Sequence, residues 1–428
     1  MLKKSIAVFL ACAAILGLAT GCSQDNNNKN DNNINDDKKT SAQNNVVFTA
    51  GNSVCYNSGS ALFCMSDDNN LKTAMMKNDD GQPEIFDFGP VNNILTDNKL
   101  YGSYNNSENL VCWDLSDTSH ISCTSLYVKE TIGSMLLDSL QNENSSVTYE
   151  DMDMLKTAFV CSVNYPSDGG SNIYFPITYD RDYYSAHKPL QFRIVEAAKN
   201  GRKIKLLPDV HASSLVVSDE YIYYYENGFD YTKETFDIDV CGIYKMKTDG
   251  SEKEKLTDCK PAFDNMLWYR PAITICGNDL YFIDKNDKDE NYLKKLSLDS
   301  KKVETISKEQ CSAYYVDQAS DTVFYTSENS DYVNTLYTHD LSNHKEKKLS
   351  EITDMTISDP LGLCVYEKYV YVCTSPNSEL WTYTNDFNIQ SPDNIPVGLR
   401  LDKKTGNQQK LYCLRNQTGQ QKSMIYWK

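Results

Sequence analysis

The signatures of several enzyme classes are missing from this chain of 428 residues. It contains no Gly-x-Ser-x-Gly elbow, no His-Glu-x-x-His pair and no glycine-rich phosphate loop. It also has no Cys-x-x-Cys motif and no cluster of cysteine with histidine, which argues against a zinc site. The sequence therefore predicts no enzyme, no metal and no cofactor. Histidine is scarce, and we expect all five histidines at the surface: His120, His187, His211, His339 and His344.

Positive charge is also in short supply. The chain has 42 Lys and Arg against 59 Asp and Glu, for a formal net charge of −17. Such a surface repels nucleic acid and the anionic face of a bilayer, so neither is an expected direct partner. The excess of negative charge mainly favours solubility.

The longest apolar run, residues 6–19, follows Lys3 and Lys4 near the N-terminus. It is too short for a typical transmembrane helix and ends in small residues, as the apolar core of a secretory signal does. Residues 18–23 read Leu-Ala-Thr-Gly-Cys-Ser. They resemble a bacterial lipobox, although Ala19 stands where a Leu is usual, and an ordinary signal peptide is the alternative. The resemblance implies that residues 1–21 are removed and that Cys22 is acylated, which anchors the protein to the outer face of the bacterial cell membrane.

The segment after Cys22 has almost no apolar side chains. Residues 23–45 consist mainly of Asn, Asp, Lys, Ser and Gln, which cannot bury enough surface to offset the entropy of ordering. We expect residues 22–45 to form a lipidated, disordered tether that holds a folded unit, residues 46–428, away from the membrane.

Cysteine is spread along the chain, and its pattern supports one local disulfide best. Cys55 and Cys64 flank Asn-Ser-Gly-Ser, and a two-residue turn at Gly59-Ser60 would place them directly opposite each other in a hairpin. Two weaker candidate pairs are Cys364 with Cys373, across a turn at Lys368-Tyr369, and Cys241 with Cys259. The alternative is that many of the fourteen cysteines are buried thiols.

The folded part of the chain repeats itself. Residues 243–256 form an alternating strand, a polar Asp-Gly-Ser turn and a second strand, and residues 293–306 and 336–349 align with them without gaps. Looser copies cover residues 192–206 and 399–411. Each copy is a predicted β-hairpin.

Two further short strands precede each hairpin, so that each repeat contains four strands and recurs about every 43 to 60 residues. Examples of these strands are residues 221–225, 280–283, 322–325 and 369–372. The pattern predicts an all-β protein, a β-propeller of four-stranded antiparallel blades. Seven blades fit best, with six or eight as alternatives. We expect a short helical insertion at about residues 131–156, and a final strand at residues 424–427 that closes the ring.

One repeat carries a family resemblance. Tyr281-Phe282-Ile283-Asp284 is similar to the Tyr-Trp-Thr-Asp motif of the low-density-lipoprotein-receptor propellers, with degenerate versions at 223–226 and 324–327. The Asp-Gly-Ser hairpin resembles that of bacterial secreted propellers of unknown function allied to that class and to TolB. The resemblance covers about half of the chain. It implies the ring architecture and no particular ligand, because the Trp is missing and the Asp is kept once.

The acidic run from Asp284 to Glu290 raises the question of calcium binding. It lacks the Gly and the terminal bidentate Glu of an EF-hand loop, and its lysines oppose a cation. We expect a solvated loop there.

The long loops supply the candidate binding residues. In a propeller blade, the loops between the second and third strands share a rim with the connections between blades, and the long loops of this chain fall on that rim. Tyr, Trp and Arg dominate binding hot spots, and aromatic rings stack on sugars. The candidate ligand-binding residues are Tyr179, Arg181, Tyr183, Tyr184, Phe229, Tyr231, Trp268, Tyr269, Arg270 and Trp381. The alternative is that these side chains pack between blades.

Three functions fit a secreted propeller. The first is a binding or scaffold module for a protein, peptide or glycan, attached to the membrane through its lipid. The second is an envelope assembly factor, and the third is a propeller enzyme such as a glycosidase, lyase or lactonase, since a fold does not determine a function. The sequence leaves the oligomeric state open.

Overall fold

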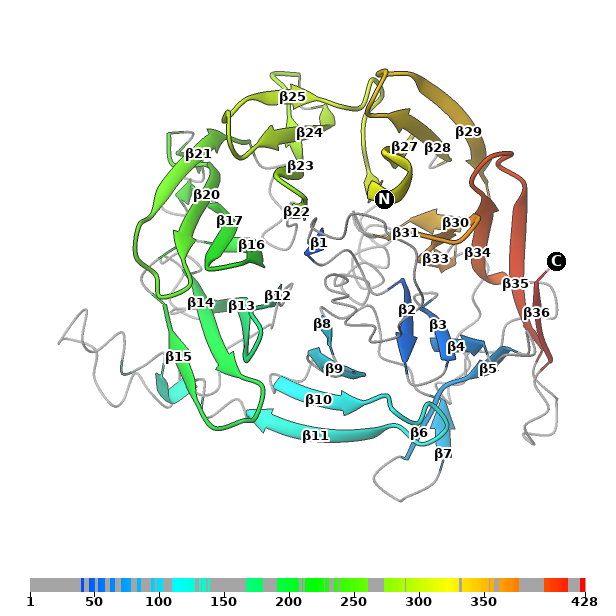
Figure 1. Cartoon of the computed structure of the whole chain (residues 1–428), viewed down its shortest axis with the longest axis horizontal. Coiled ribbons are helices and arrows are strands. Elements are labelled where there is room, and N and C mark those ends of the chain that lie inside the picture. Colours follow the sequence, from blue (N-terminus) through cyan, green and yellow to red (C-terminus); the bar gives the residue numbers. More distant parts are fainter. Residues whose placement is uncertain are drawn as a thin grey trace, which may run out of the picture.

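The chain forms a ring of seven β-sheets around a central axis (Figure 1). The computed structural model describes residues 40–41, 46–50, 53–57, 62–65, 71–77, 83–85, 94–96, 98–102, 110–127, 131, 133–135, 138, 167–179, 191–207, 210, 212–226, 228–230, 235–237, 239–260, 273–288, 290–330, 333–353, 355–357, 362–376, 396–414 and 424–427. Each of the seven sheets has four consecutive antiparallel strands, which makes the protein a seven-bladed β-propeller. The predicted fold class and the favoured blade number are confirmed.

The blades follow one another in chain order, and each runs from an inner strand at the axis to an outer strand at the circumference. The strands of blades 1 to 3 are β2 (Val47–Ala50), β3 (Ser53–Asn57), β4 (Leu62–Met65) and β5 (Leu71–Thr73); β8 (Ile94–Thr96), β9 (Lys99–Gly102), β10 (Leu110–Asp114) and β11 (Ser122–Tyr127); and β12 (Ser167–Asp168), β13 (Asn172–Tyr179), β14 (Gln191–Ala198) and β15 (Ile204–Leu206).

Blades 4 to 7 contain the repeats that the sequence shows most clearly. Their strands are β16 (Ala212–Ser218), β17 (Tyr221–Glu226), β20 (Gly242–Lys247) and β21 (Glu254–Asp258); β22 (Ile273–Cys276), β23 (Asp279–Lys285), β24 (Asn291–Ser297) and β25 (Val303–Thr305); β26 (Ala313–Asp317), β27 (Thr322–Glu328), β28 (Asn334–Asp340) and β29 (Glu346–Ile352); and β31 (Leu363–Tyr366), β32 (Tyr369–Val372), β34 (Pro396–Asp402) and β35 (Gln408–Leu414).

Apolar side chains on both faces of each blade fill the junctions between blades. The described residues form seven buried clusters, and each cluster takes its members from two neighbouring blades. This burial explains why the second strand of several blades reads as a nearly continuous apolar or aromatic run, such as residues 221–225 and 280–283, because a strand between two neighbours is covered on both faces.

Among the described strands, none is shared between blade 7 and blade 1 where the ring closes. Tyr56 on β3 is fully buried there, and its hydroxyl donates a hydrogen bond to the carbonyl of Val372 (2.6 Å) and accepts one from the amide of Leu399 (3.0 Å). The final strand β36 (Met424–Trp427) pairs with β35 as a fifth, outermost strand of blade 7. The tail therefore forms the predicted strand, and it extends the outer edge of blade 7.

Two segments bear on the predicted ends and insertion of the domain. Residues 131, 133–135 and 138 have helical backbone, and the rest of the predicted insertion at 131–156 lies outside the described residues. Thr40–Ser41, which composition assigned to the disordered tether, form the short strand β1 against β22. The difference arises because the inner edge of β22 offers hydrogen-bond partners that composition cannot reveal.

In the part of the chain that the structure describes, no helix is long and apolar enough to cross a bilayer.

Candidate functional site: the loop-rich rim

The two rims of the propeller differ in the length of their connections. Turns between first and second strands, and between third and fourth strands, share the short-turn rim; in blade 4 they are residues 219–220 and 248–253. Connections between second and third strands, and between blades, share the other rim, which we call the loop-rich rim. It contains the longest connections, residues 74–93, 128–166, 180–190, 227–241, 259–272 and 373–395. The predicted gathering of long loops on one rim follows from this topology.

Three small two-stranded sheets are found among the described strands, and all three lie in connections of the loop-rich rim. β6 (Met75–Lys77) and β7 (Pro83–Ile85) lie between blades 1 and 2, and β18 (Phe229–Asp230) and β19 (Thr235–Phe236) lie within the blade 4 loop. β30 (Met355–Ile357), from the connection into blade 7, pairs with β33 (Thr374–Pro376) of the blade 7 loop. These pairings give parts of this rim a hydrogen-bonded backbone, which suits a surface that must hold a defined shape.

The blade 4 loop begins and ends on a hydrogen-bonded base. The amide of Asp237 donates to the carbonyl of Gly228 (2.7 Å), and the amide of Cys241 donates to the carbonyl of Asp237 (3.1 Å). Beside this base, Lys255 Nζ donates to the carbonyl of Asp239 (2.7 Å). Val240 is 36% exposed and is the one large exposed hydrophobic residue among those described. The loop that carries Phe229 and Tyr231 is thus held at its root by main-chain contacts.

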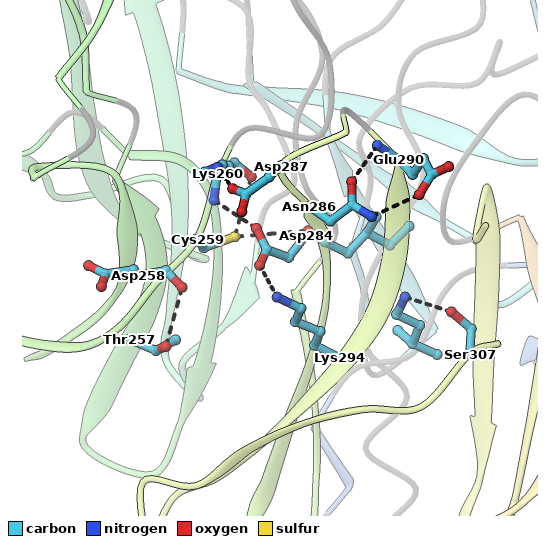
Figure 2. Close-up of polar contacts among 12 residues, drawn as sticks. Thr257, Asp258, Cys259, Lys260, Asp284, Asn286, Asp287, Glu290, Lys294 and Ser307 are labelled. Carbon is cyan, nitrogen blue, oxygen red and sulfur yellow. Dashed lines mark hydrogen bonds and ion pairs between the residues drawn. The ribbon is translucent and has the colours of Figure 1, made fainter. Parts of the chain in front are cut away.

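A buried carboxylate holds the start of the next connection (Figure 2). Asp284, near the end of β23, is 5% exposed and accepts a hydrogen bond from the amide of Lys260 (2.7 Å). Its other oxygen is paired with Lys294 on β24. Lys260 directly precedes the segment with Trp268, Tyr269 and Arg270, so Asp284 joins blade 5 to the root of that segment.

The thiol beside this carboxylate is also buried. Burial raises the pKa of Cys259 well above its ordinary value, and the nearby Asp284 carboxylate raises it further. Its sulfur lies 3.9 Å from the carbonyl oxygen of Ile283. A thiol in this environment is a poor nucleophile, because the thiolate is the reactive form.

The acidic run after Asp284 forms a turn whose polar groups bond one another (Figure 2). Asn286 Oδ1 accepts from the amides of Lys288 (2.8 Å) and Glu290 (3.1 Å), and Asn286 Nδ2 donates to Glu290 Oε2 (2.8 Å). Asp287 is 96% exposed and pairs with Lys260 Nζ at 2.5 Å, which lowers the pKa of that carboxyl. Within the described ranges, no group of three or more His, Cys, Asp or Glu side chains could hold a metal ion.

The structure places few of the predicted ligand-binding residues. Tyr179 ends β13 at the loop-rich rim, and Phe229 pairs with Phe236 in the small sheet of the neighbouring blade. Arg181, Tyr183, Tyr184, Tyr231, Trp268, Tyr269, Arg270 and Trp381 lie outside the described residues, as does Cys22. Whether their side chains form one surface stays a prediction.

The cysteine pairs fall at different registers. Cys55 and Cys64 are direct partners on β3 and β4, as a turn centred on Gly59-Ser60 requires, and their sulfurs are 2.7 Å apart in the thiol form. Cys364 is opposite Tyr371 rather than Cys373, because β31 and β32 turn at Glu367-Lys368, one residue earlier than predicted. Cys241 precedes β20 and Cys259 follows β21, each directly beyond the opposed pair Gly242 and Asp258.

We expect a Cys55–Cys64 disulfide in protein exposed to oxidant, since directly opposed strand residues have the spacing that a disulfide needs. Mass spectrometry after digestion without reduction should show the linked peptides. Recovery of both thiols unlinked from aerobically purified protein would contradict this expectation.

The surface prediction for one histidine is wrong. His339 is 4% exposed, on β28 opposite Glu346, with 3.8 Å between its Nδ1 and Glu346 Oε2. Burial lowers the pKa of His339, and the Glu346 carboxylate partly opposes this effect. Proximity to a polar turn was misleading because both faces of a blade are covered by neighbouring blades, so a strand residue near a turn can still be buried. His120 and His344 are exposed, as predicted.

No protein-family model and no curated protein matches the sequence. Among solved structures, the chain is similar to puromycin hydrolase, with 8% identity and a TM-score of 0.51 over 85% of this chain and 52% of that chain. Likenesses with lower scores are a nidogen/laminin complex, at 10% identity, a TM-score of 0.39 and coverage of 72% and 90%, and TolB from Acinetobacter baumannii, at 11%, 0.31, and 76% and 74%. The chain spans about half the length of puromycin hydrolase, and at this identity the likeness shows the propeller fold alone.

Proposed function

We propose that this protein is a lipid-anchored binding or scaffold module of the bacterial cell surface, which holds a protein, peptide or glycan on its loop-rich rim. The observation that carries the proposal is the asymmetry between the two rims. The connections of the short-turn rim have at most seven residues, whereas the loop-rich rim carries the long connections and the small sheets β6–β7, β18–β19 and β30–β33. Loops on a rigid scaffold are where binding residues concentrate.

The contacts at the roots of two loops support the same proposal. Asp284 fixes the start of the segment with Trp268, and the bond between Asp237 and Gly228 closes the base of the loop with Phe229. A recognition surface needs such support, because ordering a loop during binding weakens affinity. The lipid at Cys22 would keep this surface outside the cell and concentrate it at the membrane.

The proposal predicts that Trp268→Ala weakens ligand binding by about 2 kcal/mol or more while thermal stability stays nearly unchanged, as for an aromatic hot spot. Glycan and peptide arrays probed with the mature chain would find the ligand class, and titration of the best hit would measure the loss. Tyr369→Ala is a matched control, because Tyr369 starts β32 at the short-turn rim. We expect it to leave affinity unchanged.

The same variant also tests the competing interpretation. If Trp268 packs between blades, its removal should cost about 3–5 kcal/mol of stability, the usual loss for a large buried aromatic residue. A large fall in the melting temperature of Trp268→Ala would remove Trp268 from the proposed site.

A further inference from the structure

A piece of the N-terminal segment lies in the centre of the ring. β1 (Thr40–Ser41) pairs antiparallel with the inner edge of β22, with Thr40 opposite Cys276 and Ser41 opposite Ile275. Figure 1 shows β1 inside the ring beside this strand. The inner strand of a blade presents unpaired backbone groups towards the axis, and an added strand satisfies them.

The direction of β1 tells from which side the chain enters. β22 follows a connection at the loop-rich rim and leads into a turn at the short-turn rim, so Cys276 lies nearer the short-turn rim than Ile275 does. Because the pairing is antiparallel, the chain passes Thr40 on the short-turn side first and then moves towards the loop-rich rim. The direction of β1 itself therefore runs from the short-turn side to the loop-rich side.

The start of blade 1 agrees with this direction. β2 is an inner strand, and it runs from the loop-rich rim at Val47 to its turn at Ala50. A tether that bypassed the axis would join β2 directly at the loop-rich rim and would hold that rim against the membrane. A tether that first passes along β22 also reaches the start of β2 at the loop-rich rim, but it enters the ring at the short-turn rim.

We infer that the tether passes along β22 inside the ring from the short-turn rim, so that the anchored propeller turns its loop-rich rim away from the membrane. The orientation rests on the proposed anchor at Cys22, whereas the passage along β22 does not. Residues 22–39 then connect the lipid to the short-turn rim. A flexible chain of that length has an end-to-end distance of about 20–25 Å, so this rim stays close to the bilayer.

A disulfide tests whether residues 40–41 lie along β22 inside the ring. Thr40→Cys places a thiol opposite the native Cys276, and directly opposed strand residues are close enough to be linked. Ser41→Cys is the matched control, because its partner is Ile275. After mild oxidation of the full mature chain, we expect at least about tenfold more peptide linked to Cys276 from Thr40→Cys than from Ser41→Cys. Equal linkage, or none in folded Thr40→Cys, would overturn the passage.

Energy transfer to the membrane tests the orientation. Lys288→Cys on the loop-rich rim and Lys345→Cys on the short-turn rim are exposed positions that replace the same residue type. Both are made with Cys123→Ser, since Cys123 is an exposed thiol, and the labelled parent chain gives the background. The lipidated protein is inserted in phosphatidylcholine vesicles that contain an acceptor lipid. The rims are about 20–25 Å apart, the length of a seven-residue strand, so we expect several-fold stronger transfer from position 345.

The outcomes separate the two hypotheses. Stronger or equal transfer from position 288 would overturn the outward orientation. Cys22→Ser should give no transfer from either position. If the native Cys22 chain also fails to associate with vesicles while the Thr40→Cys link forms, the anchor and the orientation are wrong, and the passage of residues 40–41 along β22 stands.

Discussion

Replacing Tyr56 with Ala should destabilise the protein by about 3–5 kcal/mol, the range for removing a large buried aromatic side chain. Tyr56 lies where blade 1 meets blade 7, with none of the described strands shared between them, and its ring and hydroxyl contribute to that junction. Tyr56→Phe should cost about 1–3 kcal/mol, because the Val372 carbonyl and the Leu399 amide lose their partner in a buried site. Urea unfolding would measure both losses.

Gly398 offers an independent test of the packing of the Tyr56 ring against blade 7. A Cβ atom at this position would lie 2.6 Å from Tyr56 Cε1 and 2.9 Å from its hydroxyl, so Gly398→Ala should also destabilise, by about 1–3 kcal/mol. In the Tyr56→Ala background the added methyl group has room, and the second change should cost little. Tyr366→Phe, in a half-buried tyrosine of the same cluster, is the control and should stay within about 0.5 kcal/mol. Simple additivity of Tyr56→Ala and Gly398→Ala would show that the two residues do not share this contact.

Asp284→Asn should lower the free energy of unfolding by about 2–3 kcal/mol, because it leaves Lys294 without its carboxylate in a mostly buried site. The change should also speed hydrogen exchange of the Lys260 amide, which now donates to Asp284. Urea unfolding measures the first effect, and amide exchange followed by mass spectrometry measures the second.

Asp287→Asn is the matched control for Asp284. Its side chain is 96% exposed and its pairing with Lys260 lies at the surface, where solvent screens it, so the loss should be much smaller than that for Asp284→Asn. Asp284→Asn combined with Lys294→Gln should cost less than the sum of the single changes, since neither charge is then left alone. A loss for Asp284→Asn no greater than that for Asp287→Asn would show that the buried Asp284–Lys294 pair does not stabilise blade 5.

The sequence predicted the repeating architecture well because each blade is built from local hairpins. The turns near Gly250 and Gly406 could be predicted, and both glycines have positive φ in the structure, 90° and 76°. Strand alternation could be seen in the same segments. His339 shows where this local reading failed, since it is 4% exposed although its strand ends at a polar turn.

Contacts between distant parts of the chain had no sequence signal. Tyr56 contacts Val372 and Leu399, which are more than three hundred residues away in the sequence. A single tyrosine before a hairpin turn does not indicate which residues it will contact. Asp284 was noticeable as the one Asp kept in the motif resemblance, yet nothing in the sequence indicates its two partners, Lys260 on the connection between blades 4 and 5 and Lys294 on the neighbouring strand β24. For the candidate site, the shared rim of the loops could be predicted, and which side chains meet there could not.

The sequence by itself determined that the chain repeats a four-stranded unit, and that its long loops must share one rim, because alternating strand direction is a property of each antiparallel blade. The tertiary structure alone decided how the ring closes at Tyr56, which carboxylate supports the loop root at Lys260, and where Thr40–Ser41 pair. These contacts join segments that come together only when blades pack against one another, and the Tyr56 contacts form only when the ring closes. Their free energy depends on burial between blades, which no local pattern encodes.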